Sequence, residues 1–335
     1  MIHNPLISLY KRGKERIARE LGNERGESVG LDIGTKFIKL VVVDYSSGGP
    51  LLKWAGLREI SAPGEEIAAT LIADLWKEGC REIRIKEVII NLGLSPTVQR
   101  LEFPSTLSDD EVKEATLLEV SQLIPDLEEM ESDMKLFRNE GAENVPVLFI
   151  AAPRTAVAQR VSLVEKAGLS PLGMDIDSLA LLNSVVQLRK MGKGESLLIF
   201  NIGTSFTNLA MVKEGGIPFL RDIPQGSKEL LPASGDTSSP VKGIEVLTQI
   251  ERSMEYYRTR YQVEKIDRSL LTGGAVSLPA VYEYFEENMQ TSPEKWNPLL
   301  NIGHYREVPQ LRQFVEREGD HFSVALGLAL RSEVV

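Results

Sequence analysis

Apolar and polar positions alternate along the chain in short runs that predict strands and in longer periodic stretches that predict helices. Residues 197–200 are continuously apolar and only strand-sized, and 206–213 are rich in β-forming residues. Between 244 and 261, by contrast, large apolar residues recur at intervals of three or four, which is the period of an amphipathic helix. The pattern therefore predicts an α/β fold.

The two halves of the chain carry the same opening pattern. The sequence Asp-Ile-Gly-Thr-Lys-Phe-Ile-Lys-Leu at 32–40 matches Asn-Ile-Gly-Thr-Ser-Phe-Thr-Asn-Leu at 201–209 in five of nine positions. The offset is 201 − 32 = 169 residues, about half of the 335-residue chain. Each copy lies between an apolar strand and a β-rich run that ends in a glycine turn. We therefore predict an internal duplication in which each half opens with a β-meander.

The glycine turn inside each copy has the chemistry of a phosphate site. Glycine lets backbone N–H groups approach an anion closely, and Thr35 and Thr204 add hydroxyl donors. Asp32 precedes the first turn, where a carboxylate can hold water on a divalent cation carried by phosphates, and Lys39 lies farther along the strand. Two such hairpins facing each other would hold a polyphosphate from both sides. The alternative is a pair of ordinary hairpins in a duplicated scaffold.

A third glycine turn fits the same cleft. Residues 269–272 predict a strand, Gly273 and Gly274 a turn, and 278–289 a helix with Pro279 in its first turn. A strand, a glycine turn and a helix N-terminus together let the backbone approach a flat or charged ligand. A Gly-Gly pair alone is usually only a turn.

Composition and charge narrow the function classes. Lys and Arg number 38 against 48 Asp and Glu, so the net charge is −10. The chain therefore lacks the excess of basic residues that is typical of a nucleic-acid-binding protein. No apolar run reaches the roughly 18 residues of a membrane span. The single cysteine, Cys80, cannot form an internal disulfide, and we interpret it as a structural residue rather than a catalytic thiol. No Cys/His pair has zinc-ligand spacing.

The ordered set of motifs resembles the actin–hexokinase superfamily. Residues 29–39 are similar to its first phosphate motif, 201–209 to its second and 271–275 to its adenosine motif, while 167–180 and 322–331 resemble its two connecting helices. Within the superfamily the chain is most similar to the PilM family of type IV pilus assembly, and next to the FtsA family of cell division. The resemblance implies an actin-like ATPase fold, with duplicated sheet-and-helix domains around a nucleotide cleft.

The resemblance further implies that the cleft binds ATP with Mg²⁺. Asp32 would hold the metal through water, and Asp177 is the candidate to orient an attacking water, unless Asp177 or Ser178 only caps the following helix. The candidate nucleotide-binding residues are Asp32, Gly34, Thr35, Lys36, Lys39, Asn201, Gly203, Thr204, Ser205, Gly273 and Gly274.

Two features depart from the family pattern. Asn201 stands where the second phosphate motif normally begins with aspartate, and an amide carries no charge to act on magnesium-bound water. The stretch 225–244 is also shorter than in PilM-like relatives. We therefore expect a nucleotide-binding interaction protein that is at most a weak ATPase. The alternatives are a slow Mg-dependent ATPase and an FtsA-like filament-forming protein.

Residues 86–173 predict an insertion with the order strand, helix, strand, strand, helix, strand. Ser108 and Glu111 have the spacing of a capping box at the start of its first helix, and Pro125 predicts where that helix ends. This segment resembles the subdomain shared by PilM-like and FtsA-like proteins. A sugar or acetate kinase of the superfamily has no clear place for it.

Charge is concentrated in this insertion. Residues 107–133 contain ten acidic residues and one basic residue, Lys113, which indicates either an acidic docking surface or a solvated helix face. The resemblance implies that a groove beside the insertion receives the apolar N-terminal peptide of a PilN-like inner-membrane protein. It also implies contacts with other pilus-assembly proteins, and self-association stays open.

The N-terminal segment differs from the rest of the chain. An apolar opening is followed by a basic stretch, with positive charges at Lys11, Arg12, Lys14, Arg16 and Arg19. One interpretation is an amphipathic segment that touches an anionic membrane surface or a partner. The other is a solvated helix packed on the domain, or a loose tail.

These observations divide the chain into four parts, and the resemblance implies a cytoplasmic protein that is peripheral to the inner membrane. The parts are a basic appendage at 1–28, a first actin-like half at 29–85 and 174–192, the inserted subdomain at 86–173, and a second actin-like half at 193–335.

Overall fold

The computed structural model describes residues 26–46, 49–81, 83, 86–139, 141–214, 216–230, 244–289, 292–302 and 309–331. The predicted appendage at 1–28 lies outside the described residues except for its last three, and the first strand already includes Glu27. Of the short stretch 225–244, residues 231–243 also lie outside the described residues.

The first half is built on a five-stranded sheet in the order β3-β2-β1-β4-β8. Its first three strands form an antiparallel meander, and the last two add in parallel. Side chains of β2 alternate between two cores: Leu40 and Val42 pack toward α2, whereas Val41 and Val43 pack toward α11. Burial on both faces explains why this strand is almost continuously apolar. The strands are β1 (Glu27–Ile33), β2 (Phe37–Asp44), β3 (Leu51–Glu59), β4 (Glu87–Asn91) and β8 (Ser170–Asp175).

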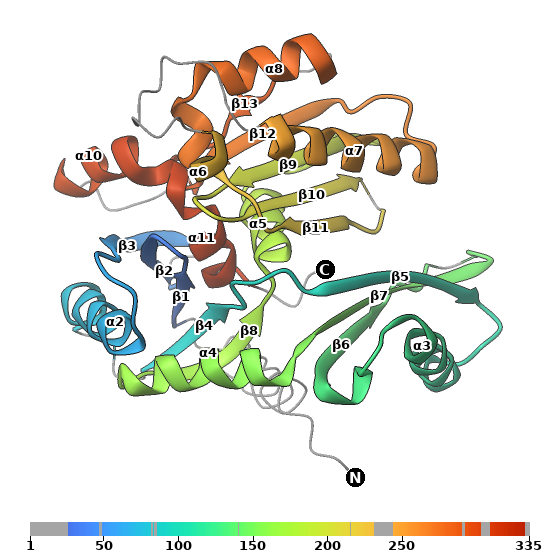
Figure 1. Ribbon diagram of the computed structural model, residues 1–335, viewed down its shortest axis with the longest axis horizontal. Helices are drawn as coiled ribbons and strands as arrows, with labels where there is room; N and C mark the ends of the chain where they lie inside the picture. The colour runs from blue at the N-terminus through green and yellow to red at the C-terminus, as the bar shows by residue number, and fades with distance from the viewer. Residues whose placement is uncertain are drawn as a thin grey trace.

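The second half repeats this arrangement in the upper lobe of Figure 1. Its sheet has the order β11-β10-β9-β12-β13, again a meander followed by two parallel strands. The predicted duplication therefore extends from a nine-residue segment with five identical positions to a whole sheet topology. The strands are β9 (Ser196–Ile202), β10 (Thr207–Lys213), β11 (Phe219–Ile223), β12 (Arg268–Gly273) and β13 (Glu294–Lys295).

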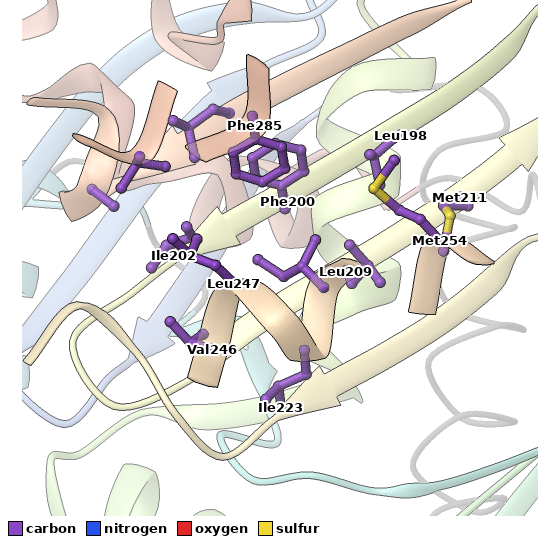
Figure 2. Close-up of a cluster of buried hydrophobic side chains, with 14 of the residues drawn as sticks. Leu198, Phe200, Ile202, Leu209, Met211, Ile223, Val246, Leu247, Met254 and Phe285 are labelled. Carbon is purple, nitrogen blue, oxygen red and sulfur yellow. The ribbon is translucent and has the colours of Figure 1, made fainter. Parts of the chain in front are cut away.

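Helices α7 (Ile244–Tyr261) and α8 (Pro279–Met289) cover the outer face of the second sheet. The predicted apolar stripe of α7 is buried there, with Leu247, Ile250 and Met254 in one cluster with the sheet residues. Figure 2 shows Phe200 of β9 and Phe285 of α8 stacked in this cluster, with ring centroids 4.6 Å apart.

Two helices join the halves. Helix α5 (Asp177–Val186) follows the first sheet but packs on the second, and α11 (Ser323–Ala329) follows the second sheet but packs on the first. The two helices also pack against each other, and a Cβ on Gly327 would lie 1.7 Å from the carbonyl oxygen of Ala180. Only glycine permits this approach of two backbones, so the halves are held close at one point.

The third sheet forms a separate lobe with the order β5-β7-β6, and α3 covers it (Figure 1). By strand pairing this lobe spans residues 97–153, which is narrower than the predicted insertion at 86–173, because β4 and β8 at its two ends belong to the first sheet. The predicted capping box is present: Ser108 and Glu111 bond to each other's backbone N–H. The elements are β5 (Thr97–Pro104), α3 (Asp109–Leu123), η1 (Leu127–Glu129), β6 (Met130–Leu136) and β7 (Asn144–Pro153).

The remaining helices complete the two halves. They are α2 (Glu65–Gly79), α4 (Arg154–Lys166), α6 (Ser227–Leu230), η2 (Gly274–Ser277), α9 (Pro298–Asn301), α10 (Pro309–Glu318) and η3 (Gly319–Phe322). None of the helices in the described part of the chain is long and apolar enough to cross a membrane.

Candidate functional site

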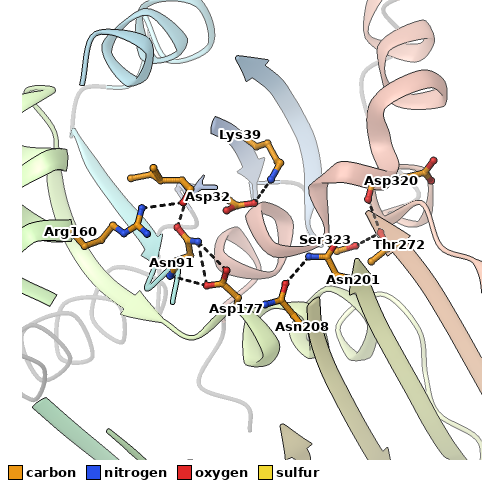
Figure 3. A network of polar contacts seen from close by, with 12 residues as sticks. Asp32, Lys39, Asn91, Arg160, Asp177, Asn201, Asn208, Thr272, Asp320 and Ser323 are labelled. Carbon is orange, nitrogen blue, oxygen red and sulfur yellow. Dashed lines mark hydrogen bonds and ion pairs between the residues drawn. The ribbon is translucent and has the colours of Figure 1, made fainter. Parts of the chain in front are cut away.

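One cavity of about 470 Å³ lies between the two halves, and all the site residues predicted from the sequence line it. These are the eleven nucleotide candidates together with Asp177. Figure 3 shows the polar side chains of this region converging from β1, β2, β9, β10 and α5. The fold thus brings together residues that are 170 and more positions apart in the sequence. Their individual roles stay predictions.

The two predicted turns face each other across the cavity. Gly34 N–H donates to the carbonyl oxygen of Phe37 at 3.0 Å, and Gly203 N–H donates to that of Phe206 at 2.9 Å. The glycine amides therefore close their own turns and are not available to a ligand. The tips approach each other, since Thr35 Oγ1 donates to Ser205 Oγ at 3.0 Å. A phosphate would consequently be met by hydroxyls and by the residues that follow each glycine.

Asp32 is already paired with a lysine. Asp32 on β1 stands opposite Lys39 on β2, and its Oδ2 accepts a hydrogen bond from Nζ at 2.6 Å. Both side chains are largely buried, with exposed fractions of 6% and 14%. A short, buried, charge-assisted contact of this kind is strong. In this arrangement Lys39 neutralises the carboxylate that was predicted to face a metal-bound water.

The second half carries an uncharged version of the same pair. Asn201 on β9 stands opposite Asn208 on β10, and Asn201 Nδ2 donates to Asn208 Oδ1 at 2.8 Å. Adding the duplication offset to Asp32 and Lys39 gives these two positions. The aspartate and the lysine have therefore both been replaced by asparagine, so no unpaired charge is left. Asn201 is among the residues predicted from the sequence and Asn208 is not, although adding the same offset to Lys39 gives its position.

The amide pair continues into a further carboxyl group. Asn208 Nδ2 donates to Asp222 Oδ1 at 2.8 Å, and Ser178 Oγ donates to Asp222 Oδ2 at 3.1 Å. Burial and then the nearby charge of Asp177 raise the pKa of Asp222 well above its usual range. This chain of contacts links the turn of the second half to the first residues of α5.

Asp177 is the first residue of α5 and does not cap it. The N-cap position is Ile176, and the alternative of a cap at Asp177 or Ser178 is wrong because neither side chain bonds to the helix end. Instead the Asp177 carboxylate accepts from Asn91 Nδ2, at 3.2 Å to each oxygen, and from Gly93 N–H at 3.1 Å. Burial and then the charge of Asp32 raise its pKa. A carboxylate with a raised pKa is better suited to accept a proton near neutral pH.

Arg160 also lines the cavity, although it is not among the residues predicted from the sequence. It lies on α4, and its Nε and Nη1 donate to the carbonyl oxygens of Leu92 at 3.1 Å and Ile33 at 3.0 Å. Burial lowers the pKa of the guanidinium, which Asp177 and then Asp32 oppose. It sits where β1 and β4 end, so it is a partly buried cation that lines the cleft. No local pattern marked it, since its partners are 68 and 127 residues away.

The third predicted turn forms another wall of the cavity. Gly273 has φ of +87°, and a Cβ there would lie 2.4 Å from Asn201 Oδ1, so this position requires glycine. His321 lines the same wall, and its ring centroid is 5.8 Å from that of Phe37 in the first half. Burial lowers the pKa of His321, which favours a neutral imidazole beside the cavity.

Other candidate chemistry is not supported among the described residues. Cys80 is buried, and burial raises the pKa of its thiol to about 12, which agrees with a structural rather than a nucleophilic cysteine. No group of three or more His, Cys, Asp or Glu residues in this part of the chain is arranged to hold a metal ion.

Comparison with known proteins gives a consistent assignment. The family model of the type IV pilus assembly protein PilM matches residues 30–232 and 240–333. Among solved structures, the chain is similar to the PilM-PilN type IV pilus biogenesis complex, with TM-score 0.74 and 24% identity over 92% of this chain and 98% of that one. A Bacteroides thetaiotaomicron protein with an actin-like ATPase fold and unknown function matches at TM-score 0.46 and 10% identity, over 83% of this chain and 93% of that one.

The family match spans nearly all of the described chain, and the similarity to the solved PilM structure covers the fold as a whole. The predicted actin-like fold and the predicted family are thereby confirmed. The chain belongs to the type IV pilus assembly protein PilM family.

Proposed function

We propose that this PilM-family chain is a scaffold that binds ATP between its two actin-like halves and docks the N-terminal peptide of a PilN-like inner-membrane protein. The observation that carries the nucleotide part is the pair of duplicated glycine turns, whose tips meet at Thr35 and Ser205 over one cavity. Docking of the peptide would hold the chain at the cytoplasmic face of the inner membrane.

The cavity fits a nucleotide in size and chemistry. Its volume of about 470 Å³ is in the range of small-molecule sites. Thr35 and Ser205 supply hydroxyl donors, and Lys36 and Lys228 supply cations at its edge. Gly273 and His321 leave a wall that a flat base can contact. Bound ATP would supply a polyanion bridging both halves, which stabilises the closed arrangement if that arrangement binds it better than an open one.

Magnesium would bind mainly through the phosphates of the nucleotide, with little direct coordination by the protein. Mg²⁺ is commonly held by one or two carboxylates, waters and substrate phosphates. Asp32 is the candidate carboxylate, and Lys39 already occupies one of its oxygens at 2.6 Å. A metal carried by the phosphates would therefore contact Asp32 through water. The negative charge of the Asp32 carboxylate would then be shared between the metal and Lys39.

The same geometry argues for binding without efficient hydrolysis. The second half offers the neutral pair Asn201 and Asn208 where the first half has Asp32 and Lys39. Asp177 is then the carboxylate left to position water. A slow Mg-dependent ATPase is the second candidate function, and the raised pKa of Asp177 is the observation that favours it.

Contacts between the inserted lobe and the second half would couple nucleotide binding in the cavity to binding of the partner peptide. Arg100 of β5 donates to the carbonyl oxygen of Ile217 at 3.2 Å and lies 4.0 Å from the centroid of the Tyr261 ring. Just before this lobe, Ser95 Oγ donates to the carbonyl oxygen of Asp222 at 2.7 Å. Any change in the angle between the halves must break or shift these bonds. The PilN part of the proposal is supported by the similar solved structure, which is a complex of PilM with PilN.

Calorimetric titration with ATP, with and without Mg²⁺, tests the nucleotide part. Ser205→Asp places a negative charge at the tip of the second turn, where two charges about 4 Å apart repel by roughly 1 to 4 kcal/mol. We expect ATP to bind the unsubstituted chain and the Ser205→Asp variant to bind at least tenfold more weakly. Ser121→Asp is the matched control on exposed α3 and should bind as the unsubstituted chain does. Equal affinity of the two variants would refute binding at the turns.

Fluorescence anisotropy tests the partner. A labelled N-terminal peptide of a PilN-like protein from the same organism should bind, and replacing the peptide's apolar residues by serine should abolish binding. Tight binding of the serine peptide would contradict docking in an apolar groove. Phosphate release after addition of Mg²⁺-ATP, lost in Asp177→Asn, would favour the slow ATPase.

A further inference from the structure

Helix α3 buries one face and leaves the opposite face without a partner in the described structure. Val112, Thr116 and Val120 are fully buried against the three-stranded sheet. Leu117 and Leu118 point the other way, with 46% and 66% of their surfaces exposed. Adjacent exposed leucines on a solvent-facing helix are unusual, because burying such side chains is favourable.

The exposed leucines lie beside concentrated negative charge. Asp110, Glu111 and Glu114 stand one to two turns before them on the same outward side of the helix, and all three are exposed. Lys113 is the one basic residue between 107 and 133, and it pairs with Asp110 at 3.0 Å. This segment has a net charge of 1 − 10 = −9. The face therefore combines an apolar centre with an acidic border.

The position of α3 separates this face from the nucleotide cavity. Figure 1 shows α3 on the outside of the inserted lobe, at the end of the molecule opposite to α2. None of its residues lines the cavity. The proposed ATP site leaves this face unexplained.

The chain itself contains a segment of complementary chemistry. Residues 1–25 include Ile2, Leu6, Ile7 and Leu9, followed by a basic stretch. Lys and Arg number six and Glu three in these residues, so their net charge is 6 − 3 = +3 in a chain whose total is −10. An apolar and basic segment matches an apolar and acidic helix face in both respects.

We propose that the N-terminal segment of this chain docks on the exposed face of α3, with its apolar residues on Leu117 and Leu118 and its basic residues against Glu111 and Glu114. The inference does not depend on nucleotide or PilN binding. A single contact would account for both the basic N-terminal segment and the acidic stretch at 107–133. The chain length allows it: about 3.3 Å per extended residue gives residues 1–25 a reach of roughly 80 Å from the start of β1. The segment can therefore reach α3 of its own chain or of a second copy.

Cross-linking in the full-length protein tests the contact. The native Cys80 is buried and its thiol is largely protonated, so introduced cysteines react selectively. Gly13→Cys is combined with Ser121→Cys on the outward side of α3, and a short bis-maleimide is added. The matched control combines Gly13→Cys with Thr70→Cys, which is exposed on α2.

We expect cross-linking of the α3 pair to exceed that of the α2 pair at least fivefold. Replacing Leu117 and Leu118 by serine should reduce the α3 product at least fivefold, and raising the salt concentration should reduce it as well. Both leucines are on the surface, so these replacements leave the core intact, which circular dichroism would check. A product at monomer size places the contact within one chain, and a product at dimer size places it between two copies.

Three results would overturn the proposal. They are equal cross-linking at α2 and α3, cross-linking that is unchanged by the leucine replacements, and absence of the product at any protein concentration. A protein that fails to cross-link but sediments with vesicles of anionic lipid, and loses this on Lys11→Glu with Arg12→Glu, would assign the segment to a membrane surface instead.

Discussion

The exchange of an aspartate–lysine pair for an asparagine pair makes a quantitative prediction about the second half. The test restores the charged pair in two steps, Asn201→Asp and Asn208→Lys. The single change Asn201→Asp replaces a donor by an acceptor, since Asn201 Nδ2 now donates to Asn208 Oδ1 at 2.8 Å. Asn208 cannot simply turn its amide over, because its own Nδ2 donates to Asp222 at 2.8 Å.

The expected cost follows from these contacts. A lost hydrogen bond that leaves a buried group unsatisfied costs about 1–3 kcal/mol. Asn201 is half-buried and opens to the cavity, which keeps the cost within this range. We expect Asn201→Asp to destabilise the chain by about 2 kcal/mol. In the double variant the introduced lysine can pair with the introduced aspartate in the register that Lys39 and Asp32 use. The two changes should therefore couple favourably, by about 2 kcal/mol.

Urea denaturation of the four proteins of this cycle, at pH 7 and low salt, measures the coupling directly. Asn139→Asp, an exposed amide in the turn after β6, is the matched control and should change the stability by less than about 0.5 kcal/mol. Additive effects within about 0.5 kcal/mol would refute the idea that the asparagine pair is the uncharged equivalent of the aspartate–lysine pair. Release of phosphate from Mg²⁺-ATP by the double variant, but not by either single one, would show that the lost charges also limit hydrolysis.

Three further predictions concern pH, coupling and packing. The raised pKa of Asp222 means that the folded chain holds this proton more tightly than the unfolded chain, so its contribution to stability falls as the pH rises above about 4. The free energy of unfolding should therefore decrease less between pH 5 and pH 8 in Asp222→Asn than in the unsubstituted chain, by at least about 1 kcal/mol in urea denaturation. An unchanged pH profile would contradict this. Arg100→Ala removes the contacts with Ile217 and the Tyr261 ring, so it should lower the free energy of unfolding by about 1–2 kcal/mol. It should also weaken any effect of ATP on the affinity for the peptide. Equal peptide affinities with and without ATP in the unsubstituted chain would contradict the coupling. Gly327→Ala forces a methyl group against the Ala180 carbonyl, 1.7 Å away, and should lower the free energy of unfolding by about 3 kcal/mol, whereas a change below about 1 kcal/mol would mean that α5 and α11 can separate freely.

Much of the candidate site could be predicted from the sequence because its chemistry is local. A glycine turn between two β-rich runs depends on a few consecutive residues, and the duplication supplied the second copy at a fixed offset. The structure accordingly brings Asp32, Gly34, Gly203 and Gly273 to one cavity. The capping box of α3 is local in the same sense, since it depends on residues three positions apart.

The tertiary structure decided what depends on contacts between distant segments. Parallel pairing places β4 and β8 in the first sheet, and parallel strands are joined by long connections that carry no local sign of their partners. Arg160 reaches the cleft from a helix 127 residues beyond the carbonyl it caps, and Asn208 meets Asp222 only because β10 pairs with β11. The charge state of the site is decided in the same way: burial between the halves raises the pKa values of Asp177 and Asp222, and burial exists only once the chain has folded.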